Sequence, residues 1–177
     1  MNLFGEEPQP SRDDWYTPPP VVAAARAVMG GIDLDPASCE EANRVVRADT
    51  FWTAQDSPLG RDWFGRVWLN PPYSDGQVRR FVDYLHAQIP NVDAALVVQP
   101  CNTSAASWRS LRRADAVCWL PDEDWADGWW GPAADAALAV TPRSRKGPWG
   151  FQPLMVAGFH VDPDLFRREF GPIGPVR

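Results

Sequence analysis

Segments with a helical pattern alternate with short apolar segments along most of this chain, and this alternation constrains its fold more than any other feature. Residues 18–31, PPPVVAAARAVMGG, predict a helix, because prolines suit the first turn of a helix and glycines its end. Residues 32–35, IDLD, predict a short strand directly after it. Strands that alternate with helices indicate an α/β fold whose sheet is mostly parallel, with helices on both faces.

The remaining elements continue the same alternation. Four apolar residues between positions 78 and 85 have i, i+3, i+4, i+7 spacing, which predicts a helix over 75–88. Residues 93–100, DAALVVQP, predict a buried strand. Further helices are predicted over 38–48, 104–114 and 162–171, and further strands over 50–52, 66–70, 115–121, 135–142 and 153–159.

Two departures from simple alternation are expected. The last two strands, 135–142 and 153–159, have no helix between them, which predicts a C-terminal antiparallel hairpin. The span from 38 to 66 is short for a full strand–helix–strand–helix set, so the sheet is expected to be a reduced version. Residues 1–14 are expected to form a flexible lead-in, and residues 15–177 a single domain.

The composition argues against several classes of protein. The three cysteines are widely spaced and form no CxxC pair, so neither a zinc ribbon nor a disulfide framework is supported. The two histidines, His86 and His160, make a poor metal site, and no metal is expected. His86 lies in the helix predicted over 75–88 and is expected to be an exposed or rim residue. A formal net charge of −6 argues against a protein that coats nucleic acid without specificity.

No apolar run approaches the roughly 18 residues of a membrane span. The polar N-terminal residues also lack the apolar core of a signal peptide. We therefore expect a soluble protein of the cytoplasm, without a membrane partner.

In a sheet of this kind, ligands bind at the carboxyl ends of the strands. Two polar clusters fall at predicted strand ends: DLDPAS at 33–38 and NPPY at 70–73. An exocyclic amino group is a poor nucleophile, because its lone pair is delocalised into the ring or amide. The Asn70 side-chain oxygen and the Pro71 carbonyl would accept hydrogen bonds from such a group, while Pro72 keeps the turn rigid and Tyr73 stacks on a planar substrate. The alternative is that NPPY is only a turn that ends a strand.

The NPPY tetrapeptide resembles the motif of amino-group methyltransferases that use S-adenosylmethionine. Before it come a Thr-Pro start in DWYTPPP, the strand end DPAS and the segment ADTFWTAQDSPL. In this order the segments are similar to the phage-type DNA N6-adenine methyltransferase family. The likeness covers residues 14 to about 113 well and the rest weakly.

The resemblance implies a Rossmann-like methyltransferase fold, S-adenosylmethionine as cofactor, and site-specific methylation of adenine N6 in double-stranded DNA, with the base flipped into the NPPY pocket. The implied catalytic residues are Asn70, Pro71, Pro72 and Tyr73. The implied cofactor-binding residues are Tyr16, Thr17, Pro18, Asp33, Asp35, Pro36, Ala37, Ser38 and Asp56. One departure is that DPASCEEAN has no glycine where many methyltransferases have a glycine-rich turn.

Other roles for these residues remain open. Asp33 and Asp35 alternate on a strand and could bind a metal as a carboxylate pair. Thr17 could be the N-cap of the first helix, which is compatible with a cofactor contact. Asp56 could serve only as a turn residue before Ser57 and Pro58.

A compact basic segment, RSRK, lies between the last two predicted strands. Arg143, Arg145 and Lys146 are the expected DNA-phosphate contacts, and a solvated loop is the alternative. If this loop does not hold DNA, the Arg79, Arg80 cluster or the Arg109, Arg112, Arg113 cluster would. The alternatives for the whole protein are methylation of another amino group, on an RNA base or a glutamine amide, and a catalytically idle binding protein of the same fold.

Overall fold

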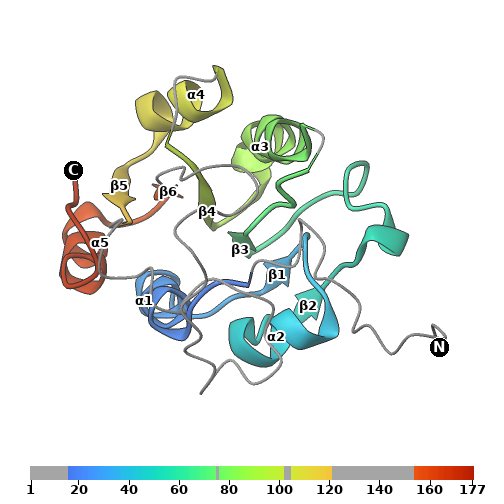
Figure 1. Ribbon diagram of the computed structural model, residues 1–177, viewed down its shortest axis with the longest axis horizontal. Helices are drawn as coiled ribbons and strands as arrows, with labels where there is room; N and C mark the ends of the chain where they lie inside the picture. Colours follow the sequence, from blue (N-terminus) through green and yellow to red (C-terminus); the bar gives the residue numbers. More distant parts are fainter. Residues whose placement is uncertain (1–15, 75, 102–104, 121–153) are drawn as a thin grey trace, which may run out of the picture.

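The structure, a computed structural model, describes residues 16–74, 76–101, 105–120 and 154–177. These residues contain one six-stranded sheet in the order β2-β1-β3-β4-β6-β5 (Figure 1). The strands are β1 (Leu34–Asp35), β2 (Thr50–Phe51), β3 (Arg66–Leu69), β4 (Ala94–Pro100), β5 (Ala116–Trp119) and β6 (Leu154–Phe159). Five strands run in the same direction, and β6 runs antiparallel between β4 and β5.

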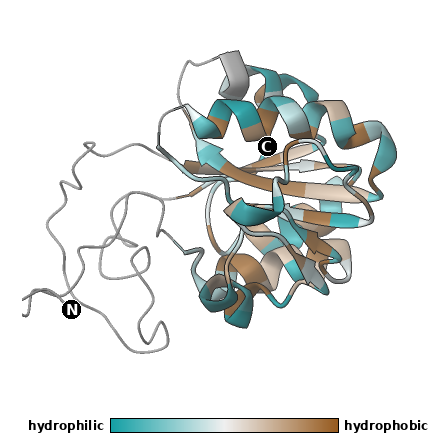
Figure 2. Cartoon of the chain, turned by 90° about the vertical axis from the view of Figure 1, so that its right-hand side faces the viewer, coloured by the Kyte–Doolittle hydropathy of each residue, from teal (hydrophilic) through white to brown (hydrophobic). Residues whose placement is uncertain are grey.

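Helices cover both faces of the sheet. The helices are α1 (Pro19–Met29), α2 (Glu40–Val46), α3 (Gln77–Gln88), α4 (Ala105–Arg113) and α5 (Pro163–Phe170), with two short 3₁₀ turns, η1 (Ala54–Asp56) and η2 (Ile89–Asn91). α1, α2 and α5 lie on one side of the sheet, and α3 and α4 lie on the other (Figures 1 and 2). None of the described helices is long and apolar enough to cross a membrane.

The hydrophobic core therefore has two layers, one on each face of the sheet. Along β4, Leu96 and Val98 face the layer beneath α1 and α5, while Ala95 and Val97 face the layer beneath α3. Every residue of β4 is buried, as expected for a central strand with helices on both of its faces.

The mostly parallel α/β architecture predicted from the sequence is confirmed, and so is its reduced form. Between residues 38 and 66 there is one helix, one two-residue edge strand and one 3₁₀ turn. The expected antiparallel strand near the C-terminus is β6, whose described neighbours are β4 and β5. The predicted strand over 135–142 and the lead-in over 1–14 lie outside the described residues, so the hairpin pairing and the domain boundary stay predictions.

The expectation that His86 is an exposed or rim residue was wrong. Its side chain is buried between α3 and α4, where its Nε2 atom lies 3.2 Å from the Ser110 hydroxyl, and its ring packs edge-on against Phe159. Burial lowers the pKa of His86 to about 4, and the positive charges of Arg113 and Arg109 add to that shift. The helical pattern marked the apolar face of α3 but did not reveal that α4 packs over His86.

Candidate functional site

A cavity of about 670 Å³ opens at the carboxyl ends of β1 and β3, a size within the usual range of about 300–1,000 Å³ for ligand sites. Side chains alternate along a strand, so Asn70 follows Trp68 on the same face. Both line this cavity together with Asp35. The predicted site residues that line it are Tyr16, Thr17, Asp35, Pro36, Ala37, Ser38, Asn70 and Pro72.

Asp35 ends β1 and is 2% exposed. The backbone N–H of Ala37 donates to its Oδ1 atom at 3.1 Å. Burial raises the pKa of the Asp35 carboxyl to about 7, and the Ala37 N–H and the Ser38 hydroxyl offset only part of that effect. Among the described residues that line the cavity, Asp35 is the only carboxylate, so it is the natural partner for a cationic group of a ligand.

Besides Ser38, whose hydroxyl acts on Asp35, two side chains that line the cavity carry a buried polar atom with no hydrogen-bond partner among the described residues. These atoms are the Thr17 hydroxyl oxygen and the Trp68 indole nitrogen, and both side chains are buried. Buried polar groups are paired in most folded proteins, so unpaired ones that line a cavity indicate a polar ligand. Thr17 does not cap α1: the N-cap residue is Pro18, and no side chain caps this helix.

The NPPY motif, which is predicted to be catalytic, forms the turn that follows β3. Asn70 and Pro72 line the cavity, and the buried Pro71 lies between them. The Tyr73 hydroxyl donates to Asn70 Oδ1 at 3.2 Å, and burial raises the pKa of the Tyr73 phenol. The amide oxygen that is expected to hold a substrate amino group is therefore in contact with Tyr73 in this structure.

Asp33 does not line the cavity. Its Oδ2 atom accepts hydrogen bonds from the Arg66 backbone N–H at 2.7 Å and from Arg66 Nε at 2.8 Å, which tie the start of β1 to β3. The hydrogen bonds from Arg66 lower the pKa of Asp33 below its ordinary value. A side chain at Gly65, where φ is +62°, would place its Cβ 2.5 Å from this carboxylate. Asp33 and Asp35 thus have different neighbours and different electrostatic environments, which does not support a shared metal site.

Asp56 and Pro18 also lie outside the lining. Asp56 Oδ2 accepts from the backbone N–H and the hydroxyl of Thr53, so its carboxylate closes the η1 turn. The Pro18 carbonyl accepts from the first backbone amides of α1. No cluster of three or more side chains suited to a metal ion occurs in the described part of the chain.

Several cavity residues were not predicted from the sequence. Trp68 could have been found, because it lies two residues before Asn70 on the same strand face. The turn around η1 contributes Gln55 and Leu59, which follow the carboxyl end of β2. Arg80, which the sequence analysis named only as part of an alternative DNA-binding cluster, reaches the cavity from α3. The expected DNA contacts Arg143, Arg145 and Lys146 lie outside the described residues.

Comparisons with known proteins support a common origin for this arrangement. The family model described as DNA N-6-adenine-methyltransferase (Dam) matches residues 5–139. A protein of Escherichia phage T1 named DNA N-6-adenine-methyltransferase is 33% identical over 117 residues, which is 64% of this chain and 47% of that protein. The chain thus spans about half the length of this curated relative.

Proposed function

The chain belongs to the DNA N-6-adenine-methyltransferase family, and from this premise we propose that it methylates adenine N6 at specific sites in double-stranded DNA, with S-adenosylmethionine as the methyl donor. One observation carries the proposal. Asp35 and Asn70, which end neighbouring parallel strands, line a single cavity at the carboxyl edge of the sheet. A cofactor held at the first residue and an amino group held at the second would therefore meet.

The cavity fits the amino-acid end of S-adenosylmethionine. That end carries an ammonium and a carboxylate, and the molecule when bound would supply an activated methyl group on a positively charged sulfur. Asp35 would hold the ammonium, because a buried carboxylate with no ion-pair partner among the described residues gains most from a cation. The Thr17 hydroxyl and the Trp68 indole N–H would donate to the carboxylate, which would satisfy both unpaired atoms.

The target amino group would be held by the turn after β3. Asn70 Oδ1 and the Pro71 carbonyl would each accept a hydrogen bond from one of its two N–H groups, so that the nitrogen lone pair leaves conjugation and points at the methyl group. After transfer, the nitrogen would release one of these protons to water. Tyr73 would give up its hydrogen bond to Asn70 and stack on the adenine ring. An adenine inside a duplex cannot reach such a cavity, so the base would have to be flipped out of the helix.

Two measurements on the whole protein test this function. Calorimetry with S-adenosylmethionine asks whether the cavity binds the cofactor. Transfer of a labelled methyl group is then followed on duplex DNA, RNA and a glutamine-containing protein in parallel, and the DNA product is digested to identify the modified base. Label in N6-methyladenine of DNA alone is the expected result. Label in RNA or protein would show that this molecule, and not DNA, is the substrate. Cofactor binding without any methyl transfer would indicate a binding protein.

A further inference from the structure

α4 is fixed to the rest of the molecule by polar contacts along its inner face. The Ser107 hydroxyl donates to the Pro100 carbonyl at 2.6 Å, and Ser110 meets the buried His86 of α3. Both serines are buried. The outer face of α4 is therefore held in a defined position and is not a frayed segment.

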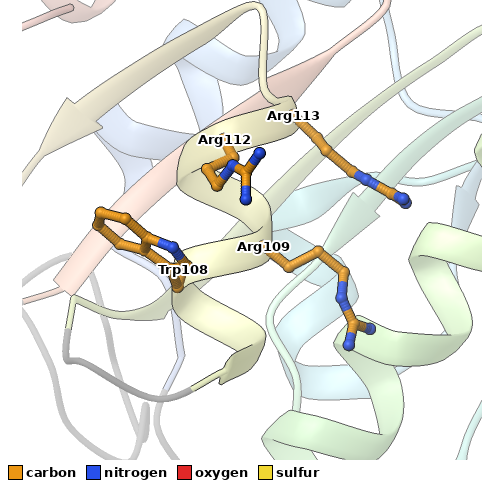
Figure 3. Close-up of a pocket in the computed structure, with 4 residues that line it drawn as sticks. All are labelled: Trp108, Arg109, Arg112 and Arg113. Carbon is orange, nitrogen blue, oxygen red and sulfur yellow. The ribbon is translucent and has the colours of Figure 1, made fainter.

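The solvent-facing side of α4 and its flank toward α3 carry a tryptophan and three arginines. Trp108 is 59% exposed, and Arg112 lies one turn further along the helix. Figure 3 shows their side chains on α4 with those of Arg109 and Arg113. These four residues, here called the α4 surface, line a shallow hollow of about 400 Å³, and the described residues lining it include no carboxylate.

Positive charge is concentrated on this side of the molecule. Arg109 forms an ion pair with Asp83 of α3, whereas Arg112 and Arg113 form none within the described residues. Together α3 and α4 carry five arginines against one aspartate, a net charge of +4 in a chain whose total is −6. The low pKa of His86 is consistent with this concentration of positive charge. Burial is the main cause of the lowered pKa, and the charges of Arg113 and Arg109 lower it further.

We propose that the α4 surface binds the phosphodiester backbone of the double-stranded DNA that carries the target adenine; this inference rests on the proposed function. Arginine matches phosphate because its guanidinium donates two parallel hydrogen bonds. Trp108 adds a flat apolar face that packs on a deoxyribose beside the phosphate. The acidic remainder of the chain repels DNA, so a basic surface fixes the side from which the duplex approaches.

The position of α4 agrees with this role. The helix follows β4, whose carboxyl end lies beside that of β3 in the sheet, so it begins at the same edge as Asn70. Nine residues make α4 about 13 Å long, and one DNA strand presents a phosphate about every 3.4 Å. Arg112 and Arg113 lie in the last turn of α4, away from that edge, so a duplex that reaches both them and the cavity would have to run along the helix.

The first test removes two positive charges from α4 and, as a control, two positive charges from α5. Arg112→Gln with Arg113→Gln is compared with Arg167→Gln and Arg168→Gln, two consecutive exposed arginines in the last turn of α5. Affinity for a labelled duplex is measured by fluorescence anisotropy over a salt series. Each lost phosphate contact lowers the log–log salt slope by about 0.9, so the α4 variant should lose about 2 and the α5 variant almost nothing.

A second variant separates the ring from the charges. Trp108→Ala should weaken duplex binding by roughly tenfold and leave the salt slope unchanged, because an uncharged ring releases no counterions. Calorimetry with S-adenosylmethionine should give the wild-type affinity in all three variants, which shows that the fold and the cavity are intact.

The outcomes distinguish this inference from the function on which it rests. Equal salt slopes in the wild type and the α4 variant, with normal DNA binding, would overturn the inference alone. A wild-type protein that binds the cofactor but no duplex would overturn DNA as the substrate, and the α4 inference with it. Binding to vesicles of phosphatidylserine and phosphatidylcholine but not to DNA would assign the α4 surface to an anionic membrane and would also overturn the inference.

Discussion

The cavity at the carboxyl edge and the α4 surface differ in the sign and in the burial of their charged groups. In the cavity, a single carboxylate on Asp35 is buried, and its raised pKa records the cost of ionising it without a cation. On α4, Arg112 and Arg113 are exposed to solvent, so their side chains are not desolvated. A buried charge interacts strongly with a nearby partner and is little screened by salt, whereas exposed charges interact more weakly and are largely screened beyond about 10 Å at 0.1 M salt. The cavity therefore suits selection of one small molecule, and the α4 surface suits attraction of a polyanion.

Asn70→Ala should have the largest effect on activity, and this effect should be limited to the chemistry in the cavity. Loss of an aligned hydrogen-bond acceptor typically lowers the rate of the chemical step by about 100-fold or more. Cofactor affinity and the salt slope for DNA should stay close to wild type, because Asn70 is expected to contact only the substrate amino group. Single-turnover methyl transfer gives the rate, and Asn91→Ala, a change at an exposed asparagine of η2, is the control. Wild-type turnover in Asn70→Ala would remove NPPY from the mechanism.

Asp35→Asn should weaken cofactor binding and strengthen the fold. A hydrogen bond to a charged partner contributes about 1.5–3 kcal/mol, so affinity for S-adenosylmethionine should fall at least about tenfold. The asparagine is not ionisable, so at pH 8 the free energy of unfolding should rise, by up to about 4 kcal/mol if the whole pKa shift is relieved. Calorimetry and denaturant unfolding measure the two effects. A variant that is less stable and binds normally would contradict both.

The raised pKa of Asp35 also predicts a dependence of cofactor binding on pH. When the pH is below the Asp35 pKa of about 7, the Asp35 carboxyl of the free protein is mostly protonated and cannot pair with an ammonium. Affinity for S-adenosylmethionine should therefore rise roughly eightfold between pH 6 and pH 7.5 in the wild type, with proton release on binding. Asp35→Asn should show a flat profile over the same range. A flat wild-type profile would mean that Asp35 is already ionised or does not bind the cofactor.

Tyr73 gives a smaller and more selective effect. Tyr73→Phe keeps the ring but removes the hydroxyl that donates to Asn70 Oδ1. Suppose that the ring stacks on the base and that the hydroxyl only bonds to Asn70 before the substrate binds. The variant should then keep the methyl-transfer rate within a few-fold of wild type and lower the KM for DNA. Tyr73→Ala should lose roughly tenfold or more, since stacking of a base on an aromatic ring contributes about 1–3 kcal/mol. Equal losses in both variants would assign the role to the hydroxyl.

The cavity was easier to predict from the sequence than the α4 surface, because its residues belong to local sequence patterns. Asp35 and Asn70 each end a short apolar segment, and the carboxyl ends of parallel strands meet at one edge. A local pattern in the sequence was therefore enough to place both residues at this edge. The fold class followed from the same alternation of elements, including the reduced segment between β1 and β3, where a 3₁₀ turn stands in place of a second helix.

What the sequence did not reveal depends on contacts between distant segments. Asp33 and Asp35 look equivalent in the sequence, but Arg66 binds the first and leaves the second for the cavity. His86 is buried only because α4 packs across α3. Trp108 could have been read as a core residue, and only the packed helix pair leaves its ring exposed.

Asp33→Asn should have the smallest effect and should sharpen the contrast with Asp35. The carboxylate is partly exposed and bonded to Arg66, so its loss should lower the free energy of unfolding by only about 1 kcal/mol at pH 7. The pKa of Asp33 is lowered by Arg66, so this contribution is present above the ordinary pKa of an aspartate and disappears as the pH falls through the lower, folded-state value. The stability of Asp33→Asn should therefore approach that of the wild type in acid, whereas the advantage of Asp35→Asn should grow as the pH rises from about 4 to 7 and then level off. Cofactor affinity, measured by calorimetry, should be that of the wild type. A loss of affinity as large as that of Asp35→Asn, in a folded protein, would place Asp33 in the cofactor site after all.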